Sequence, residues 1–344
     1  MKKALIALAV LGLTGGAAVA QSSVTLFGVI DADLRYTKSS GQSLKKLDSS
    51  GLNTSRFGLR GTEDLGGGLK AGFWLESEIN TDTGVAGAAS GGAFWGRRAT
   101  VSLSGDFGEI RLGRNKTTSR LHLEDFDPYA FTGLGNVGAV YSNLGSGNGT
   151  AYGRADNLAS YSLPEGLGGF YGSVDVAAPE GNLANKYQGA RLGYKAGPLH
   201  VSGTYANANG PTDKYKLASV GGAYDFGVAR PSLVYSQAKF GARKQTIITA
   251  AVTVPLGQGQ IIASYTDAKA NDAAEAVTAG SARIGDSKLF AAGYVYNLSK
   301  RTALYTTVSQ IKNDGAAKFA VAGSPTVAAG AKSSGFDVGI RHNF

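Results

Sequence analysis

The chain has 344 residues, with 34 Lys and Arg against 25 Asp and Glu, and it has no cysteine, which excludes disulfides and thiol chemistry. It contains 51 glycines but only 8 prolines, together with 16 tyrosines and 14 phenylalanines, a composition that suits an extended sheet with many tight turns. No linker, charge block or change of composition divides the chain, so we expect one domain.

The first twenty residues have the layout of a secretory signal peptide. Met1–Lys3 is positively charged, residues 4–13 are apolar, and Ala18–Ala20 places small residues at the cleavage positions. We expect cleavage near Ala20, which leaves residues 21–344. Removal of the two lysines lowers the formal net charge from +9 to +7, because 34 − 2 = 32 basic residues then face 25 acidic ones. No later run reaches about eighteen apolar residues, so the sequence predicts no transmembrane helix.

After the signal peptide, apolar and polar residues alternate in one segment after another. Residues 24–36 show the pattern: one face carries Val24, Leu26, Ile30, Leu34 and Tyr36, and the other carries Asp31, Asp33 and Arg35. A period of two indicates a strand with opposite faces in different surroundings. The next expected elements are a polar loop at 38–53, a strand at 56–61, a turn at 63–68, a strand at 69–78, a loop at 81–92, a strand at 99–104 and a turn at 105–108.

The same alternation returns to the end of the chain, with one interruption. Residues 115–150 form a long segment with acidic and aromatic residues and no clear period, which is typical of a functional loop. The last strand places Phe336, Val338, Ile340 and the final Phe344 on one face. An apolar strand of this kind at a free sheet edge invites aggregation, so we expect that it closes a barrel with lipid outside and that Phe344 lies at the closure.

The length predicts the number of strands. A membrane-spanning strand with half a loop and half a turn takes about twenty residues, so residues 21–344 give an antiparallel, all-β transmembrane barrel of about sixteen strands, with eighteen as the alternative. A barrel of that size encloses a water-filled channel, whereas eight strands would be filled by side chains.

Several segments resemble the general porins of the Neisseria, Comamonas and Burkholderia type. They are Ser22–Asp31, Gly51–Lys70, Ser104–Gly108, Leu112–Arg114, Leu298–Thr302 and Val338–Phe344. The resemblance implies a homotrimer of sixteen-stranded barrels in the Gram-negative outer membrane, with the third external loop folded into each lumen at about residues 115–150. It also implies contact with outer-membrane lipid and lipopolysaccharide, recognition of the C-terminal strand by the barrel-assembly machinery, and passage of small hydrophilic solutes and anions.

A diffusion channel needs no catalytic residue, because selectivity comes from pore width and from fixed charges at the narrowest point. Alternation places Arg56 and Arg60 on the lumenal face. The resemblance implies a basic wall with an arginine at Arg56, one on the fourth strand and one after the loop, which matches Arg154. On the fourth strand alternation selects Arg98 whereas the resemblance selects Arg97, so both remain candidates. Another arginine typical of the family is replaced by Ser160.

The opposing charge is expected on the inserted loop, where Glu124, Asp125 and Asp127 form an acidic cluster. Facing charges of opposite sign would create a transverse field that weakens as salt rises, since the Debye length is about 10 Å at 0.1 M. Two alternatives stay open: the three carboxylates are solvated loop charges, or the arginines form ion pairs within the wall and do not influence permeation.

Other functions have weaker support. Gly133–Gly138 matches the dinucleotide fingerprint, but no strand precedes it and no helix follows, so we expect no nucleotide cofactor. The basic residues are dispersed rather than gathered in a stripe, which argues against nucleic acid. A barrel hydrolase needs a nucleophile beside a base, and His122, His200 and His342 lack a matching serine motif. We therefore expect a non-enzymatic porin with weak anion preference; the alternative is a channel specific for an anion such as phosphate or an organic acid.

Overall fold

The computed structural model describes residues 23–87, 92–147, 152–180, 186–276 and 284–344. The expected signal peptide with its cleavage site, and residues 148–150 of the expected loop, lie outside these ranges. Within these ranges the helices are α2 (Thr118–Phe126), η2 (Val137–Val140) and α3 (Asp272–Glu275). None of the described helices is long and apolar enough to cross a membrane.

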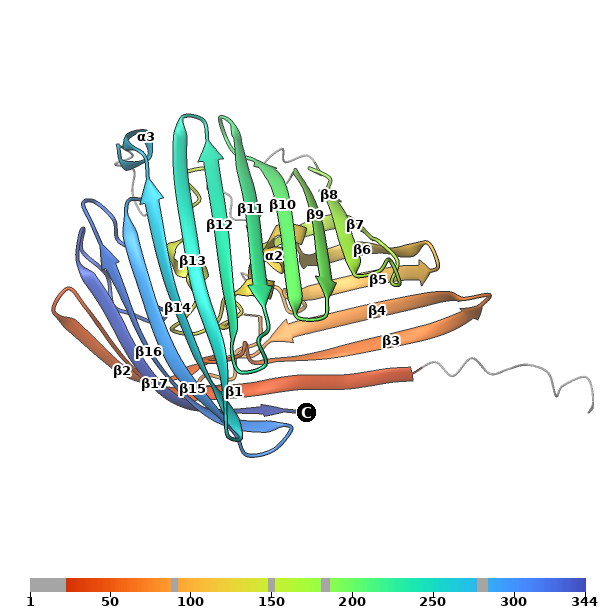
Figure 1. The fold of residues 1–344 in the computed structure, drawn as a ribbon, viewed down its shortest axis with the longest axis horizontal. Coiled ribbons are helices and arrows are strands. Elements are labelled where there is room, and N and C mark those ends of the chain that lie inside the picture. The colour runs from red at the N-terminus through yellow and green to blue at the C-terminus, as the bar shows by residue number, and fades with distance from the viewer. Residues whose placement is uncertain (1–22, 88–91, 148–151, 181–185, 277–283) are drawn as a thin grey trace, which may run out of the picture.

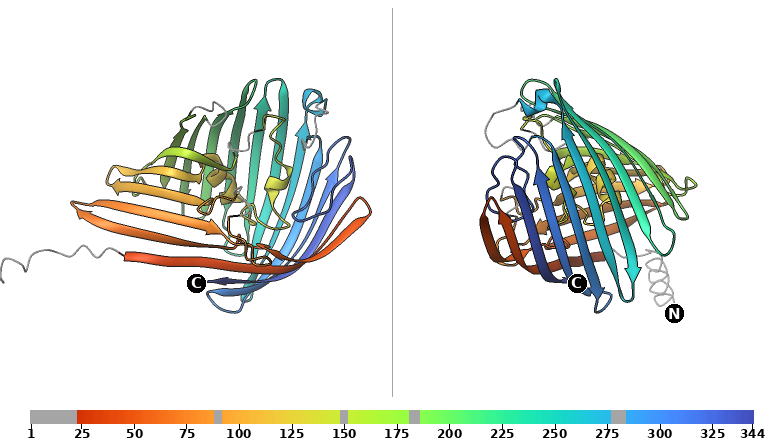
Figure 2. Two further views of the ribbon diagram at one scale, coloured as in Figure 1. Left: turned by 180° about the vertical axis from the view of Figure 1, so that it is seen from behind. Right: turned by 60° about the vertical axis from the view of Figure 1, so that its left-hand side comes forward.

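The strands fill most of the described chain. They are β1 (Ser23–Ser39), β2 (Gln42–Ser49), β3 (Arg56–Gly66), β4 (Leu69–Glu78), β5 (Arg98–Gly105), β6 (Gly108–Lys116), β7 (Arg154–Ser162), β8 (Phe170–Ala177), β9 (Tyr187–Ala196), β10 (Leu199–Asn209), β11 (Lys214–Tyr224), β12 (Arg230–Phe240), β13 (Arg243–Leu256), β14 (Gly259–Ala270), β15 (Ser287–Asn297), β16 (Thr302–Asn313) and β17 (Lys332–Asn343). Apart from β2 and β3, which each pair with β1, consecutive strands pair antiparallel around the wall that Figures 1 and 2 show.

The sheet closes on itself, because β17 returns to pair with β1 from Val29 opposite Asn343 to Ser39 opposite Ser333. At this seam the backbones of Phe344 and Gly28 exchange two hydrogen bonds of 3.0 and 3.1 Å. Both β2 and β3 pair with β1, so they are two halves of one barrel strand, and the closed barrel has sixteen antiparallel strands. The predicted fold is confirmed.

The bounds predicted for one loop and one turn are wrong. Instead of a loop at 38–53, β1 continues to Ser39 and the chain returns as β2 after a turn in which Ser40 and Gly41 have φ of 51° and 83°. Residues 42–49 lack clean alternation, which hid the strand, although Ser40–Gly41 fits a hairpin turn with two positive φ values. The turn expected at 63–68 is also shorter, since β3 extends to Gly66.

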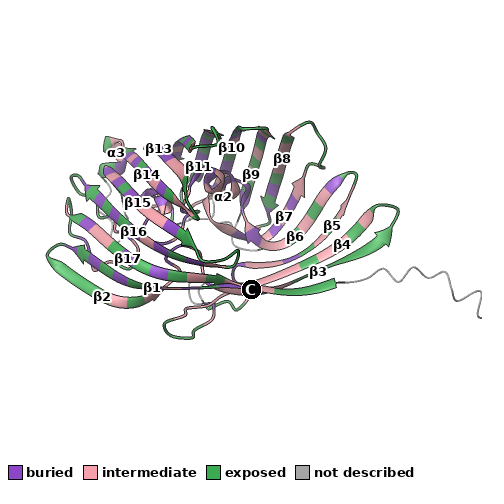
Figure 3. Cartoon of the chain, turned by 60° about the horizontal axis from the view of Figure 1, so that its bottom comes forward, coloured by how far each residue is buried: buried purple, intermediate pink, exposed green. Residues whose placement is uncertain are grey.

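The outer surface carries the predicted apolar faces. Exposed side chains include Val24, Leu26, Leu34, Tyr36, Phe336, Val338 and Ile340, whereas Asp31, Asp33 and Asp337 point inward and are buried. Figure 3 shows buried and exposed residues alternating along the strands. An apolar belt outside and polar groups inside is the arrangement required of a barrel in a bilayer.

Part of the inner wall is apolar, which alternation alone did not predict. Leu217, Ile247 and Leu289 face inward and are fully buried, together with Phe126 and Leu144 of the segment between β6 and β7. That segment folds into the barrel, and α2 packs on β8 to β12 (Figure 2). These inward positions are apolar because the segment covers them, so they form a small hydrophobic core inside the channel.

Candidate functional site

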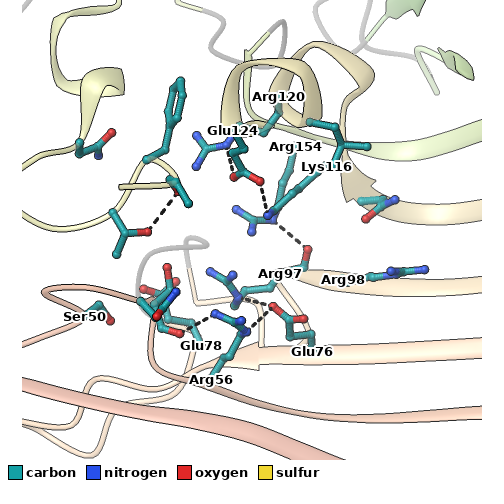
Figure 4. A pocket seen from close by; sticks show the side chains of 18 of the residues that line it. Ser50, Arg56, Glu76, Glu78, Arg97, Arg98, Lys116, Arg120, Glu124 and Arg154 are labelled. Atoms are coloured by element: carbon teal, nitrogen blue, oxygen red, sulfur yellow. Dashed lines mark hydrogen bonds and ion pairs between the residues drawn. The ribbon is translucent and has the colours of Figure 1, made fainter. Parts of the chain in front are cut away.

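The inserted segment leaves a charged opening against the opposite wall (Figure 4). The cavity has a volume of about 680 Å³. Its charged lining consists of Arg56, Arg97, Arg98, Arg111, Lys116, Arg120 and Arg154 against Glu76, Glu78 and Glu124. The seven basic and three acidic side chains give an excess of four positive charges (7 − 3).

Glu76 on β4 holds two of the arginines together. Its Oε1 lies 2.6 Å from Nε of Arg97 and 3.6 Å from Nε of Arg56. Arg56 also donates from a terminal nitrogen to the carbonyl of Thr54, at 2.9 Å. One carboxylate therefore fixes two guanidinium groups but balances only one of their charges, which leaves this part of the wall positive.

Arg154 lies at the start of β7, opposite Lys116 in the register with β6. Its Nε donates to the carbonyl of Arg97 at 2.9 Å, as Figure 4 shows. Among the described residues no carboxylate lies within 4.0 Å of its guanidinium. Arg154 is thus held by a neutral acceptor and keeps its charge uncompensated at short range.

The side chains of Arg97 and Arg98 both point into the lumen, so both candidates from this part of the chain lie at the opening. Arg98 is the first residue of β5 and follows its alternation, with its guanidinium 4.3 Å from the ring centroid of Trp74. Arg97 precedes the strand and is therefore not bound by the alternation of faces. Its backbone N–H donates to the carbonyl of Glu76 at 3.2 Å, which turns its side chain toward the opening.

Arg60, which the sequence analysis placed in the basic wall, lies on the lumenal face of β3 but not at this opening. Its guanidinium packs over Phe27 and Trp74, at 5.2 and 5.1 Å from the ring centroids. It lines a separate cavity closer to the short turn between β3 and β4.

Only one carboxylate of the expected acidic cluster lines the opening. Glu124 lies 2.6 Å from Nζ of Lys116 and 2.5 Å from Nε of Arg120. Burial alone would raise the pKa of Glu124, but these two cations outweigh it and hold the pKa below its ordinary value. Glu124 is therefore ionised and paired with cations on its own side of the opening.

The other two carboxylates hold the loop in place. Asp125 forms an ion pair with Arg191 and lies 3.4 Å from Nε2 of His200. Asp127 is buried and accepts from the backbone N–H groups of Tyr129 and Phe131, at 3.0 and 2.8 Å. Sequence proximity of the three acids did not reveal this division, because each points in a different direction from the end of α2.

His122 and Phe126 anchor the loop, a role that the sequence did not indicate. The Nδ1 of His122 lies 2.7 Å from Oγ of Ser202, and its Nε2 lies 2.9 Å from Oγ of Ser219. The ring of Phe126 packs on that of His200, with centroids 4.8 Å apart. Burial lowers the pKa of His122 to about 3, so the imidazole is neutral at ordinary pH. These serines stabilise the histidine within a buried contact.

The glycine motif at 133–138 also serves the loop. Gly133 has φ of 65°, and a Cβ there would lie 1.7 Å from the carbonyl oxygen of Gly51. A Cβ on Gly135 or Gly138 would meet the rings of Tyr129 and Phe131, at 2.4 and 2.5 Å. The glycines therefore allow the loop tip to pack on the break between β2 and β3.

A closed barrel with an apolar outer face and a charged lumen is a transmembrane channel. Comparisons with known proteins indicate the same class of protein. A model described as Gram-negative porin matches residues 7–316. Outer membrane porin protein 32 of Delftia acidovorans is 41% identical, with all of both chains covered. Major outer membrane protein P.IB of Neisseria meningitidis serogroup B is 26% identical over the full length of both.

Solved structures agree. The anion-selective porin from Comamonas acidovorans superposes with a TM-score of 0.84 and 36% identity, covering 94% of this chain and 100% of that chain. OmpT of Vibrio cholerae in its trimer form has a TM-score of 0.64 and 17% identity, with 94% and 99% covered, and shows the shared fold. The chain belongs to the Gram-negative porin family and is an outer-membrane porin.

Proposed function

We propose that this porin is a passive diffusion channel that favours small hydrophilic anions. The observation that carries the proposal is the excess of four positive charges among the side chains lining the opening (7 − 3). Charges inside a narrow passage with low-dielectric walls raise the local concentration of counter-ions and oppose the entry of cations. The anion-selective porin from Comamonas acidovorans, which has a similar sequence and fold, supports this assignment.

We assign the basic wall to Arg56, Arg97, Arg98 and Arg154, with residues 115–150 as the constriction loop. Arg60 contributes on the turn side rather than at the opening. Glu124 supplies the negative charge of the loop, and Asp125 and Asp127 act as internal supports. The transverse field across the opening is therefore weaker than it would be if all three loop carboxylates faced the basic wall.

The remaining proposals follow from the family. The chain acts as a homotrimer after removal of a signal peptide near Ala20, contacts lipopolysaccharide, and is inserted by the barrel-assembly machinery through a strand that ends in Phe344. Relatives bear the names of porins, which are channels, and we propose that this chain likewise catalyses no chemical step.

The test is the reversal potential of purified protein in planar bilayers across a KCl gradient. We expect anion preference, and we expect Arg154→Ala to shift the reversal potential toward cation preference. The shift should be larger at 0.1 M than at 1 M salt, because the Debye length falls from about 10 Å to about 3 Å. Arg154→Lys keeps the charge and should retain the preference, and Arg301→Ala, in an exposed turn, should behave as wild type. Preference for K⁺ over Cl⁻ in the wild-type channel would refute the proposal.

A further inference from the structure

A second cavity lies between the opening and the short turns of the barrel, and it shares Arg98 and Arg111 with the opening. This cavity has a volume of about 380 Å³ and lies on the inner faces of β3 to β6. The polar and aromatic lining consists of Arg60, Thr62, Phe73, Trp74, Arg98, Ser102, Ser104, Glu109 and Arg111. Short turns face the periplasm in barrels of this kind, so the cavity lies on the periplasmic side of the constriction.

Trp74 holds two of the arginines of this cavity. Arg60 and Arg98 both pack on its indole, with guanidinium carbons 5.1 and 4.3 Å from the ring centroid. The indole is itself fixed, because its N–H donates to Glu76 at 3.3 Å and Phe27 packs against it edge-on at 5.0 Å. Stacking uses the faces of the guanidinium groups and leaves their in-plane N–H groups for a ligand.

The three arginines are only partly neutralised. Arg111 pairs with Glu109, yet its Nε is buried and has no hydrogen-bond partner among the described residues. Arg98 donates from Nε to the hydroxyl of Thr100 at 3.0 Å. Within the described part of the chain, Arg60 and Arg98 have no carboxylate at ion-pair distance. Three cations and one anion leave two positive charges (3 − 1) beside unsatisfied donors.

We propose that this cavity is a second anion-binding site, which takes a small dianion such as an inorganic oxyanion or a short dicarboxylate. Two uncompensated charges match a dianion, and the in-plane donors of several guanidinium groups suit its oxygen atoms. Arg98 and Arg111 line both this cavity and the opening, so an anion that leaves the constriction meets the second site directly. The channel thus binds two anions in succession. The order of passage rests on the proposed function, whereas binding at this site does not.

Selenate, a sulfate analogue with an anomalous scattering signal, tests the site in crystals of the full-length protein. We expect one peak at the constriction and a second one between Arg60, Arg98 and Arg111. The double variant Arg60→Gln/Ser102→Ala should lose the second peak and keep the first, because neither residue lines the opening. Lys70→Gln removes a positive charge from the same face of β4 without touching the cavity, so it should keep both.

Conductance gives an independent readout in the same variants. In potassium sulfate, the concentration at which single-channel conductance half-saturates should rise at least about tenfold in the double variant, since one charge-assisted contact and one hydroxyl contact are lost, and should stay unchanged in Lys70→Gln. Three results would each overturn the proposal. The first is a peak at the constriction with none at the second site, and the second is a second peak that persists in the double variant. The third is an unchanged half-saturating concentration in the double variant, which would mean that the second peak is an adventitious ion only. If the wild-type channel shows no anion preference in KCl but the second peak behaves as described, the proposed function is refuted and the second binding site stands.

Discussion

Phe126 offers the sharpest test of how the loop is held inside the barrel. It is 1% exposed, packs between the rings of His122 and His200 at 5.4 and 4.8 Å, and lies so close to β11 that a Cβ on Gly221 would meet its ring at 2.6 Å. Replacing a buried Phe by Ala costs about 3–5 kcal/mol. If about 3 kcal/mol of this cost falls on the docking of α2, the undocked fraction of the loop rises roughly a hundredfold.

The measurement uses the absence of cysteine from the chain. A single Ser119→Cys substitution places a thiol on α2 at a fully buried position, where a water-soluble thiol reagent reacts only after α2 leaves the wall. Phe126→Ala should raise the labelling rate about a hundredfold and add current noise in bilayers. Phe226→Ala, which removes an exposed ring from the outer surface, should change neither. A labelling rate within about threefold of that control would refute the assigned anchoring role.

Two further predictions concern the same loop. Gly133→Ala should lower the thermal transition of the folded barrel and alter conductance, because the new Cβ would lie 1.7 Å from the carbonyl oxygen of Gly51; Gly147→Ala, at a similar φ of 69° but in open space, should have a smaller effect in both measurements. The second prediction concerns pH. Burial raises the pKa of Asp127 from 3.8 to about 7, so the docked loop binds that proton more tightly than the undocked loop, and docking weakens as pH rises from about 4 to 7. Burial lowers the pKa of His122 from 6.5 to about 3, so its contribution to docking is lost as pH falls through that window and opposes the first trend. In His122→Gln the opposing contribution of His122 is absent, so labelling of the same cysteine, corrected for the intrinsic reactivity of a free thiol, should increase with pH between 4 and 7, by up to about tenfold per pH unit. A flat or falling profile would contradict the assignment to Asp127.

The barrel itself could be predicted because its physics is local. Alternation follows from the two faces of a strand, and lipid outside with water inside makes the pattern strong in segments such as 24–36 and 335–344. Alternation did not predict the strand at 42–49, because two leucines three residues apart interrupt the period of two. The turn residues just before it were the better indication of a hairpin.

The interior of the site could be predicted only in part. Arg56 and Arg154 reach the opening because their positions on strands fix their direction. Nothing in the sequence near Asp127 shows that it accepts backbone hydrogen bonds, or that Leu217 and Ile247 face a loop rather than water. These contacts depend on how a segment without a period folds back, which is a property of the closed barrel and not of any one stretch.

The distribution of acids explains why the opening stays basic. A carboxylate on the loop could neutralise the wall only if it were free to face it, and each has another partner: Arg191 for Asp125, backbone N–H groups for Asp127, and Lys116 with Arg120 for Glu124. Holding the loop in the lumen therefore uses the negative charges that would otherwise offset the arginines. Of these three loop carboxylates Glu124 is the one that lines the opening, and it is shared by two cations, so the same contacts that narrow the passage also leave its positive charge in excess.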